Sequence, residues 1–351
     1  MKKATAVALV AIFILGLFEA GYGLAAESLP RNETLYTANS APPPTNANPF
    51  TGGSVLGIDG LVFEPLFMFN FMTGELKPWL AESGKWVGDN VFEVKLRSGL
   101  KWQDGEPLTA EDVKFSYEYY EKIGLRNWGG DLGLKEIKVV DDRTVQFIFD
   151  GTPNYQLWQL QMFFGWGGQG ALIVPKHVFE NINPEDIPKM TFTGDEMKYL
   201  VGSGAYKLKE VVGQEKAILE RNDDWWGGVK VFGKPGPKYI VQLYVTDNNQ
   251  AANMFIKGDL DVGTYYIDIV SAKQKNPKLV SWLDKYPPYF PPVAPPVLLY
   301  FNTKHAPLDN PKVRRAIAMA INISDRQPGS DKRPSEGGSL RPRSPQEMGG
   351  R

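Results

Sequence analysis

Side chains that perform covalent chemistry are scarce in this sequence. Cysteine is absent, and histidine occurs only twice, at His177 and His305. This composition excludes disulfides, thiolate metal sites, cysteine nucleophiles and a lipid-modified N-terminal cysteine, and it makes a histidine-rich metal site impossible. Asp and Glu number 40, but no spacing singles out a carboxylate pair of the kind that glycosidases use. We therefore expect no catalytic residue, no metal and no other cofactor.

Aromatic and amide side chains gather in one glycine-broken stretch. Trp158, Phe164, Trp166 and Gln169 lie there. Sugars stack on aromatic rings and offer hydroxyls to amides, whereas a peptide requires main-chain partners and often a charge for each terminus. Core packing is the commoner role of any single aromatic ring, so both roles stay open. Residues 165–170 are not a phosphate-binding loop, because the closing Gly-Lys-Ser/Thr is missing.

The first residues resemble an export signal. Lys2 and Lys3 precede an uncharged, mostly apolar run at residues 4–18, and small residues follow up to Ala26. This pattern predicts a secretory signal peptide at residues 1–26, removed near Ala26. The alternative is a retained membrane anchor, but Glu19 and the short apolar run favour removal. We expect the protein to work outside the cytoplasmic membrane, in the periplasm or at the cell surface.

Helical and strand patterns alternate through the rest of the chain without repeats. Thr109 can cap a helix with acids in its first turn, Gly258 is placed to end another, and Asn310 can start a third. The net charge of −1 gives no attraction to nucleic acid. The fold class is α/β with antiparallel additions. Expected strands include residues 33–37, 91–97, 137–140, 144–149, 260–262 and 297–301, and expected helices are residues 109–122, 248–257 and 310–321.

Four motifs occur in a characteristic order and carry a family resemblance. They are Val94–Val113, Val201–Tyr206, Glu220–Trp226 and Phe301–Ile317. Together they resemble the family 5 solute-binding proteins, the oligopeptide- and dipeptide-binding type that serves ABC importers. The resemblance covers residues 33–322. Within the family, residues 223–239 are similar to the branch that binds β-linked oligosaccharides, and peptide binding stays open.

The resemblance implies a type II periplasmic binding protein-like fold, with two lobes and an extra subdomain. Residues 27–60 and 169–259 would form lobe I, residues 61–168 the inserted subdomain, and residues 260–322 the incomplete start of lobe II. The ligand, an oligopeptide or β-linked oligosaccharide, would be enclosed between the lobes by a hinge motion and passed to a membrane permease. A monomer is expected, with no nucleic acid partner. Candidate ligand contacts, next to strand ends, are Asn39, Trp158, Trp166, Gln169, Tyr265 and Tyr266.

The composition changes abruptly after Asn322. Residues 323–351 contain no aromatic residue, and their apolar residues are Ile323, Leu340 and Met348. Such a segment cannot bury enough surface to order itself. We expect a disordered tail from a frameshifted or artificially joined end, an incomplete second lobe, and weak or absent ligand binding by this chain. A natural disordered linker is the alternative.

Two other function classes remain open from the residues. One is a secreted carbohydrate-active enzyme with a carboxylate pair beside an aromatic cleft. The other is a chaperone-like or signalling descendant of the same fold. Turnover of labelled cello-oligosaccharides would favour the enzyme, whereas saturable binding without products would favour the binding protein.

Overall fold

The computed structural model describes residues 29–39, 43–51, 53–70, 75–151, 171–263, 269–280 and 299–321. The chain divides into two compact units, residues 1–293 and 294–351. Among the described residues, no helix combines the length and the apolar character needed to cross a membrane.

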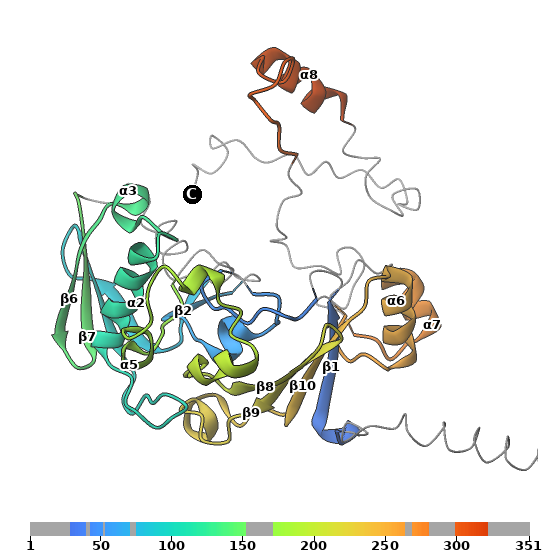
Figure 1. The fold of residues 1–351 in the computed structure, drawn as a ribbon, viewed down its shortest axis with the longest axis horizontal. Coiled ribbons are helices and arrows are strands. Elements are labelled where there is room, and N and C mark those ends of the chain that lie inside the picture. Colours follow the sequence, from blue (N-terminus) through green and yellow to red (C-terminus); the bar gives the residue numbers. More distant parts are fainter. Residues whose placement is uncertain are drawn as a thin grey trace, which may run out of the picture. The chain divides into compact units, whose positions relative to one another are not determined.

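The first sheet, here named the β8–β10 sheet, has the strand order β1-β10-β9-β8 (Figure 1). β1 runs parallel to β10, with Thr34 beside Tyr239 and Asn39 beside Tyr244. β10, β9 and β8 pair antiparallel. The four strands span Thr34–Asn39, Tyr206–Val212, Lys216–Arg221 and Tyr239–Tyr244. They all come from the two ranges predicted for lobe I.

The second sheet, here named the β4–β7 sheet, is antiparallel with the order β4-β5-β7-β6. Its strands span Ala81–Trp86, Val91–Leu96, Leu134–Asp141 and Thr144–Phe149. Phe92, Val94 and Leu96 alternate with more exposed residues along β5, as predicted, and are buried. A separate hairpin pairs β2, Phe67–Asn70, with β3, Glu75–Pro78.

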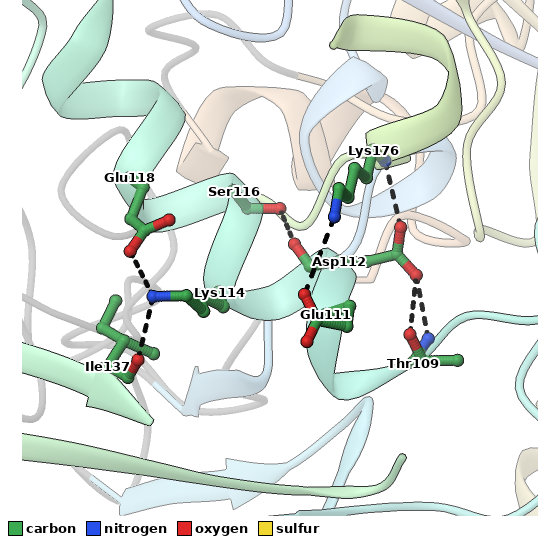
Figure 2. A network of polar contacts seen from close by, with 8 residues as sticks. All are labelled: Thr109, Glu111, Asp112, Lys114, Ser116, Glu118, Ile137 and Lys176. Atoms are coloured by element: carbon green, nitrogen blue, oxygen red, sulfur yellow. Dashed lines mark hydrogen bonds and ion pairs between the residues drawn. The ribbon is translucent and has the colours of Figure 1, made fainter. Parts of the chain in front are cut away.

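Helix α2, Ala110–Lys122, lies against the β4–β7 sheet, and its N-terminus is fixed by one buried carboxylate (Figure 2). Asp112 Oδ2 accepts a hydrogen bond of 2.9 Å from the backbone N–H of Thr109, the N-cap residue. Asp112 Oδ1 accepts one of 3.0 Å from the N–H of Lys176. Lys176 is the first residue of α5, Lys176–Phe179. Asp112 therefore caps two helices at once.

Ser116, one turn further along α2, strengthens the same junction. Its Oγ donates to the carbonyl of Asp112 at 2.6 Å and accepts from the N–H of Val174 at 2.9 Å. Lys114 pairs with Glu118 and also donates to the carbonyl of Ile137 in β6, at 3.1 Å (Figure 2). These bonds join α2 to the β4–β7 sheet on one side and to residues 174–176 on the other.

One large apolar core runs through both sheets. It includes Phe63 after the turn at Ile58–Val62, Phe147 in the second sheet, and Phe179 in α5. A smaller core lies under α6, Asn248–Lys257, where Ala38 meets Val245, Ala251 and Leu260. The shared core means that residues predicted for lobe I and for the inserted subdomain pack together. The predicted boundary between them stays a prediction.

The remaining short elements complete the path of the chain. α3 is Trp128–Leu132 and α7 is Ile269–Lys275. Single turns occupy Arg31–Glu33, Ile58–Val62, Ile187–Lys189, Gly194–Tyr199 and Gly228–Phe232. Gly258 ends α6 in the left-handed region, with a φ of 88°, as its position predicted.

In the second unit, α8 spans Pro311–Ala320, which confirms the predicted helix. The Asn310 side chain caps it by accepting a hydrogen bond of 2.9 Å from the N–H of Lys312. No residue of α8 is buried among the described residues. The strand expected at residues 297–301 is wrong for its described part: Leu299 and Tyr300 are not in a strand and are 57% and 84% exposed. The described residues offer them no strand to pair with.

Candidate ligand-binding site

The carboxyl ends of β1 and β10 meet at one edge of the β8–β10 sheet because the two strands are parallel. Asn39, the last residue of β1, lies there half-buried beside Tyr244. Its carbonyl accepts a hydrogen bond of 2.9 Å from the N–H of Val245. The backbone of Asn39 is thus fixed at this end of the strand. In open α/β sheets, ligands bind outside the carboxyl ends of the strands.

A third chain segment reaches the same edge. Val262 pairs parallel with Thr37 through an isolated bridge, and the Thr37 hydroxyl donates to the Val262 carbonyl at 3.4 Å. Val262 is 43% exposed. The predicted contacts Tyr265 and Tyr266 lie outside the described residues, in the gap between Gly263 and Ile269. Their approach to the edge of β1 stays a prediction.

The approach of this third segment is held by an ion pair at the other end of β1. Arg31 contacts both carboxylate oxygens of Asp261, at 2.6 and 3.0 Å, and donates to the carbonyl of Gly258 at 3.1 Å. The Asp261 carboxylate also accepts from the N–H of Tyr36 at 2.7 Å. The hydrogen bond and charge of Asp261 raise the pKa of Arg31, which favours its charged form. These bonds hold residues 258–261 against β1.

Buried amides fix the loop that follows β1. Gln242 of β10 is fully buried, accepts from the N–H of Leu56 at 2.6 Å and donates to the carbonyl of Ser54 at 3.0 Å. Asn48, also fully buried, donates to the carbonyls of Ile187 and Met190 at 2.7 and 2.9 Å. These amides are satisfied inside the protein, so they position the edge instead of contacting a ligand.

Exposed amides occupy the start of α6, in the segment that follows β10. Asp247 caps the helix by accepting from the N–H of Gln250 at 2.7 Å. Asn248, Asn249 and Gln250 are exposed directly after the carboxyl end of β10. Together with Asn39, they offer donors and acceptors without net charge. Such groups suit hydroxyls and peptide amides alike.

The tryptophan motif has a different place. Arg221 ends β9, and residues 222–238 connect it to the amino end of β10, opposite to Asn39 and Tyr244. Trp225 and Trp226 point their indole N–H groups at the buried carboxylate of Glu64, at 3.1 and 2.7 Å. The motif that suggested an oligosaccharide-binding branch therefore makes structural contacts in this protein.

Glu64 is the centre of a group here named the Glu64 joint: Glu64, Trp79, Ser203, Trp225 and Trp226. Trp79 Nε1 and Ser203 Oγ each donate to the carboxylate at 2.8 Å, beside the two indoles of the motif. The residue is 0% exposed. Burial raises the pKa of Glu64 to about 7, while the four hydrogen bonds oppose that rise. Sequence reasoning missed this residue, although a lone acid in the apolar run from Val62 to Phe67 was a usable signal.

The remaining predicted contacts have no described position. Trp158, Trp166 and Gln169 lie outside the described residues, as Tyr265 and Tyr266 do. Asn39 alone of the predicted contacts is placed. His177, in α5, places its Nε2 2.8 Å from Asp104 Oδ2. No group of three or more metal-ligating side chains occurs among the described residues.

Comparisons with known proteins agree with this fold. The sequence model described as "Bacterial extracellular solute-binding proteins, family 5 Middle" matches residues 75–325. A periplasmic oligopeptide-binding protein of an oligopeptide ABC transporter from Thermotoga maritima, solved with mannohexaose bound, is 36% identical, with a TM-score of 0.72. That comparison covers 85% of this chain and 54% of the other. The predicted α/β fold of the type II periplasmic binding protein kind is confirmed.

Two relatives have names that refer to peptides or to the cell wall. The peptidoglycan-binding protein YepA of Agrobacterium fabrum is 29% identical over 259 residues, which is 70% of this chain and 40% of YepA. The dipeptide-binding protein of Escherichia coli is 25% identical over 337 residues, 88% of this chain and 58% of the relative. The chain thus spans about half the length of the relatives that it matches.

Proposed function

Because the chain belongs to the family 5 bacterial extracellular solute-binding proteins, we propose that it contributes to ligand capture for an ABC importer. Members of this family are substrate-binding proteins. The proposed role is non-covalent. The protein, acting as a monomer, binds a solute outside the cytoplasmic membrane and delivers it chemically unchanged to a membrane permease. Ligand binding would select a closed state about a hinge.

The proposed ligand is an oligosaccharide. The supporting observation is the 36% identity to a protein whose structure holds mannohexaose. The amides of Asn39, Asn248, Asn249 and Gln250 suit such a ligand, because they supply both donors and acceptors for hydroxyls. An oligopeptide is the second candidate, supported by the dipeptide-binding relative.

The proposed contacts are Asn39 and the predicted residues beyond the described part of the chain. Trp158 and Trp166 would supply stacking faces and Gln169 an amide, while Tyr265 and Tyr266 would approach from the segment after Gly263. This assignment rests on the sequence and on the position of Asn39. It requires the ligand to lie at the carboxyl ends of β1 and β10.

Calorimetry with mannohexaose, cellohexaose and a mixed-sequence hexapeptide, each at millimolar concentration, separates the candidates. Saturable heat with a hexasaccharide and none with the peptide supports the saccharide, and the reverse supports the peptide. Chromatography of the recovered ligand tests for chemistry: shorter products would contradict a pure binding role.

The site assignment has a matched pair of variants. Asn39→Ala removes an amide at the carboxyl end of β1, whereas Asn32→Ala removes an exposed amide just before its amino end. We expect at least a fivefold loss of affinity from Asn39→Ala, since a lost hydrogen bond is worth about 1 kcal/mol. Asn32→Ala should leave affinity unchanged. Equal affinity of both variants and the parent would refute the placement.

A further inference from the structure

We infer that the contacts of the Glu64 joint depend on pH. They form with uptake of a proton by Glu64, and they open more readily when Glu64 loses this proton. The joint connects three separate parts of the chain. Glu64 and Trp79 come from the range predicted for the inserted subdomain, and Ser203 comes from the segment before β8. Trp225 and Trp226 come from the connection between β9 and β10.

The buried carboxylate of Glu64 has no cationic partner among the described residues. Among the described residues, no lysine, arginine or histidine forms an ion pair with Glu64. Arg97 contacts two partners of Glu64. Its guanidinium carbon lies 5.8 Å from the ring centre of Trp226, and its Nε donates to the Trp79 carbonyl at 2.6 Å. A buried carboxylate without a cation loses hydration that hydrogen bonds only partly replace. The closed joint therefore favours the neutral acid relative to an open joint that water can enter.

The four donors set how the proton can be held. Oε1 accepts from Trp79 and Trp225, and Oε2 accepts from Trp226 and Ser203. An indole N–H is a donor only, whereas a hydroxyl both donates and accepts. When Glu64 is protonated on Oε2, this O–H group can therefore donate a hydrogen bond to Ser203 Oγ, once the Ser203 hydroxyl has rotated. The three indoles keep their acceptors, because each carboxyl oxygen has two lone pairs.

Close packing at the same place keeps water out of the closed joint. Gly202 and Gly204 lie against the backbone of residues 61–62, where an added Cβ would come within 2.0 Å of the Val62 or Leu61 carbonyl oxygen. The N–H of Gly204 donates to the Val62 carbonyl at 2.9 Å, and the N–H of Ile173 donates to the Glu64 carbonyl at 3.0 Å. Both amides report on whether the joint is open.

The direction of the pH effect follows from the pKa. The pKa of Glu64 is about 7 when closed, against an ordinary value of 4.5. The closed joint therefore binds more protons than the open one between those values, and its stability falls as pH rises from 4.5 to 7. The difference of 2.5 pH units corresponds to an increase of about 300-fold in the opening equilibrium over this window.

Other titratable groups near the joint must be separated from Glu64. Burial raises the pKa of Asp59, in the turn before Glu64, to about 6. In the connection after β9, Asp223 is paired with Arg221 and Lys234 and has a lowered pKa. Burial raises the pKa of Tyr206, which follows the Ser203 segment, so it stays neutral. Asp59 is thus the group that titrates in the same range, and a Glu64 variant distinguishes the two.

Hydrogen exchange on the 351-residue protein tests the inference. Exchange of the Gly204 and Ile173 amides is followed at pH 5.5, 7.0 and 8.5, corrected for the intrinsic rate and compared with the Phe149 amide of the β4–β7 sheet. We expect opening at Gly204 and Ile173 to rise by one to two orders of magnitude from pH 5.5 to 8.5, as the linkage requires. In Glu64→Gln the rise should vanish, and in Glu180→Gln, an exposed acid, it should persist.

The inference is overturned if opening does not increase with pH, or if Glu64→Gln keeps the wild-type increase. Trp226→Phe provides a second test should Glu64→Gln fail to fold. It removes one donor that favours the ionised form, so the midpoint of the transition should move upward by about one pH unit. A midpoint that does not move, or that moves downward, contradicts the inference.

Discussion

Asp112 offers the sharpest test of how the two helices α2 and α5 are held. Its carboxylate, 6% exposed, accepts from the backbone N–H groups of Thr109 and Lys176 at 2.9 and 3.0 Å. Asp112→Ala leaves both donors without their acceptor in a place that water reaches poorly. A lost N-cap bond costs about 0.5–2 kcal/mol, so the two together should lower the free energy of unfolding by about 1–4 kcal/mol.

A graded series separates the two bonds from the charge. Asp112→Asn keeps one acceptor oxygen and should lower the free energy of unfolding by about half as much. Glu111→Gln is the matched control, because Glu111 is the neighbouring acid. Its side chain is 57% exposed and pairs with Lys176 Nζ at 3.7 Å. That exposed pair is worth at most about 0.5 kcal/mol.

Guanidinium chloride unfolding, followed by tryptophan fluorescence at pH 7.5, measures the series. The slope of the transition should be unchanged, so that the midpoints report stability. Hydrogen exchange at the Lys176 amide should accelerate in Asp112→Ala before the global transition does. Unfolding free energies of Asp112→Ala and Glu111→Gln that agree within 0.5 kcal/mol would refute the double cap.

Three further variants test other contacts. Gln242→Ala should lower the free energy of unfolding by about 2–3 kcal/mol in denaturant titrations, because it leaves the Leu56 N–H and the Ser54 carbonyl unpaired; no change would show that water replaces the amide. Gly204→Ala should abolish soluble expression, because a Cβ would lie 2.0 Å from the Leu61 carbonyl oxygen, whereas Gly236→Ala, with open space, should express normally. Arg31→Ala should lower the free energy of unfolding by at most about 1 kcal/mol, since the Arg31 side chain is 53% exposed. It should nevertheless speed hydrogen exchange of the Asp261 amide. Unaltered exchange at Asp261 would contradict a role of the Arg31–Asp261 pair in holding residues 258–261.

Local signals in the sequence predicted the helices well. A capping residue at Thr109, acids in the following turn and a glycine at Gly258 act over a few residues, and α2 and α6 match the predicted ranges closely. The alternation of Phe92, Val94 and Leu96 likewise depends only on the period of a strand. These elements could be predicted because the physical cause lies within the element itself.

Contacts between distant segments could not be predicted in the same way. Glu64 meets Trp225 across 161 positions, and Asp112 meets Lys176 across 64. Nothing local distinguishes a buried, satisfied carboxylate from an exposed one, apart from an apolar neighbourhood. The tryptophan pair was therefore assigned by resemblance alone, and its role at Glu64 became visible only in the fold.

The candidate site was predicted through the rule that ligands lie beyond strand ends. That rule selected Asn39, which ends β1 beside Tyr244 of the parallel strand β10; its contact with a ligand stays a prediction. The strand expected at residues 297–301 shows the limit of composition: Leu299 and Tyr300 have strand-like neighbours in sequence but no pairing partner among the described residues. A strand needs a second strand, and the pattern of one segment does not supply it.

Mapping of chemical shifts tests the central claim, ligand capture at the carboxyl ends of β1 and β10, most directly. Backbone amide resonances of the 351-residue protein would be followed while mannohexaose is added to millimolar concentration, which also detects weak binding. The account predicts saturable shifts at Asn39, Val245 and Asn248, with the Trp225 and Trp226 indole resonances unchanged. Shifts confined to Trp225 and Trp226, or an absence of shifts with both mannohexaose and a hexapeptide, would contradict it.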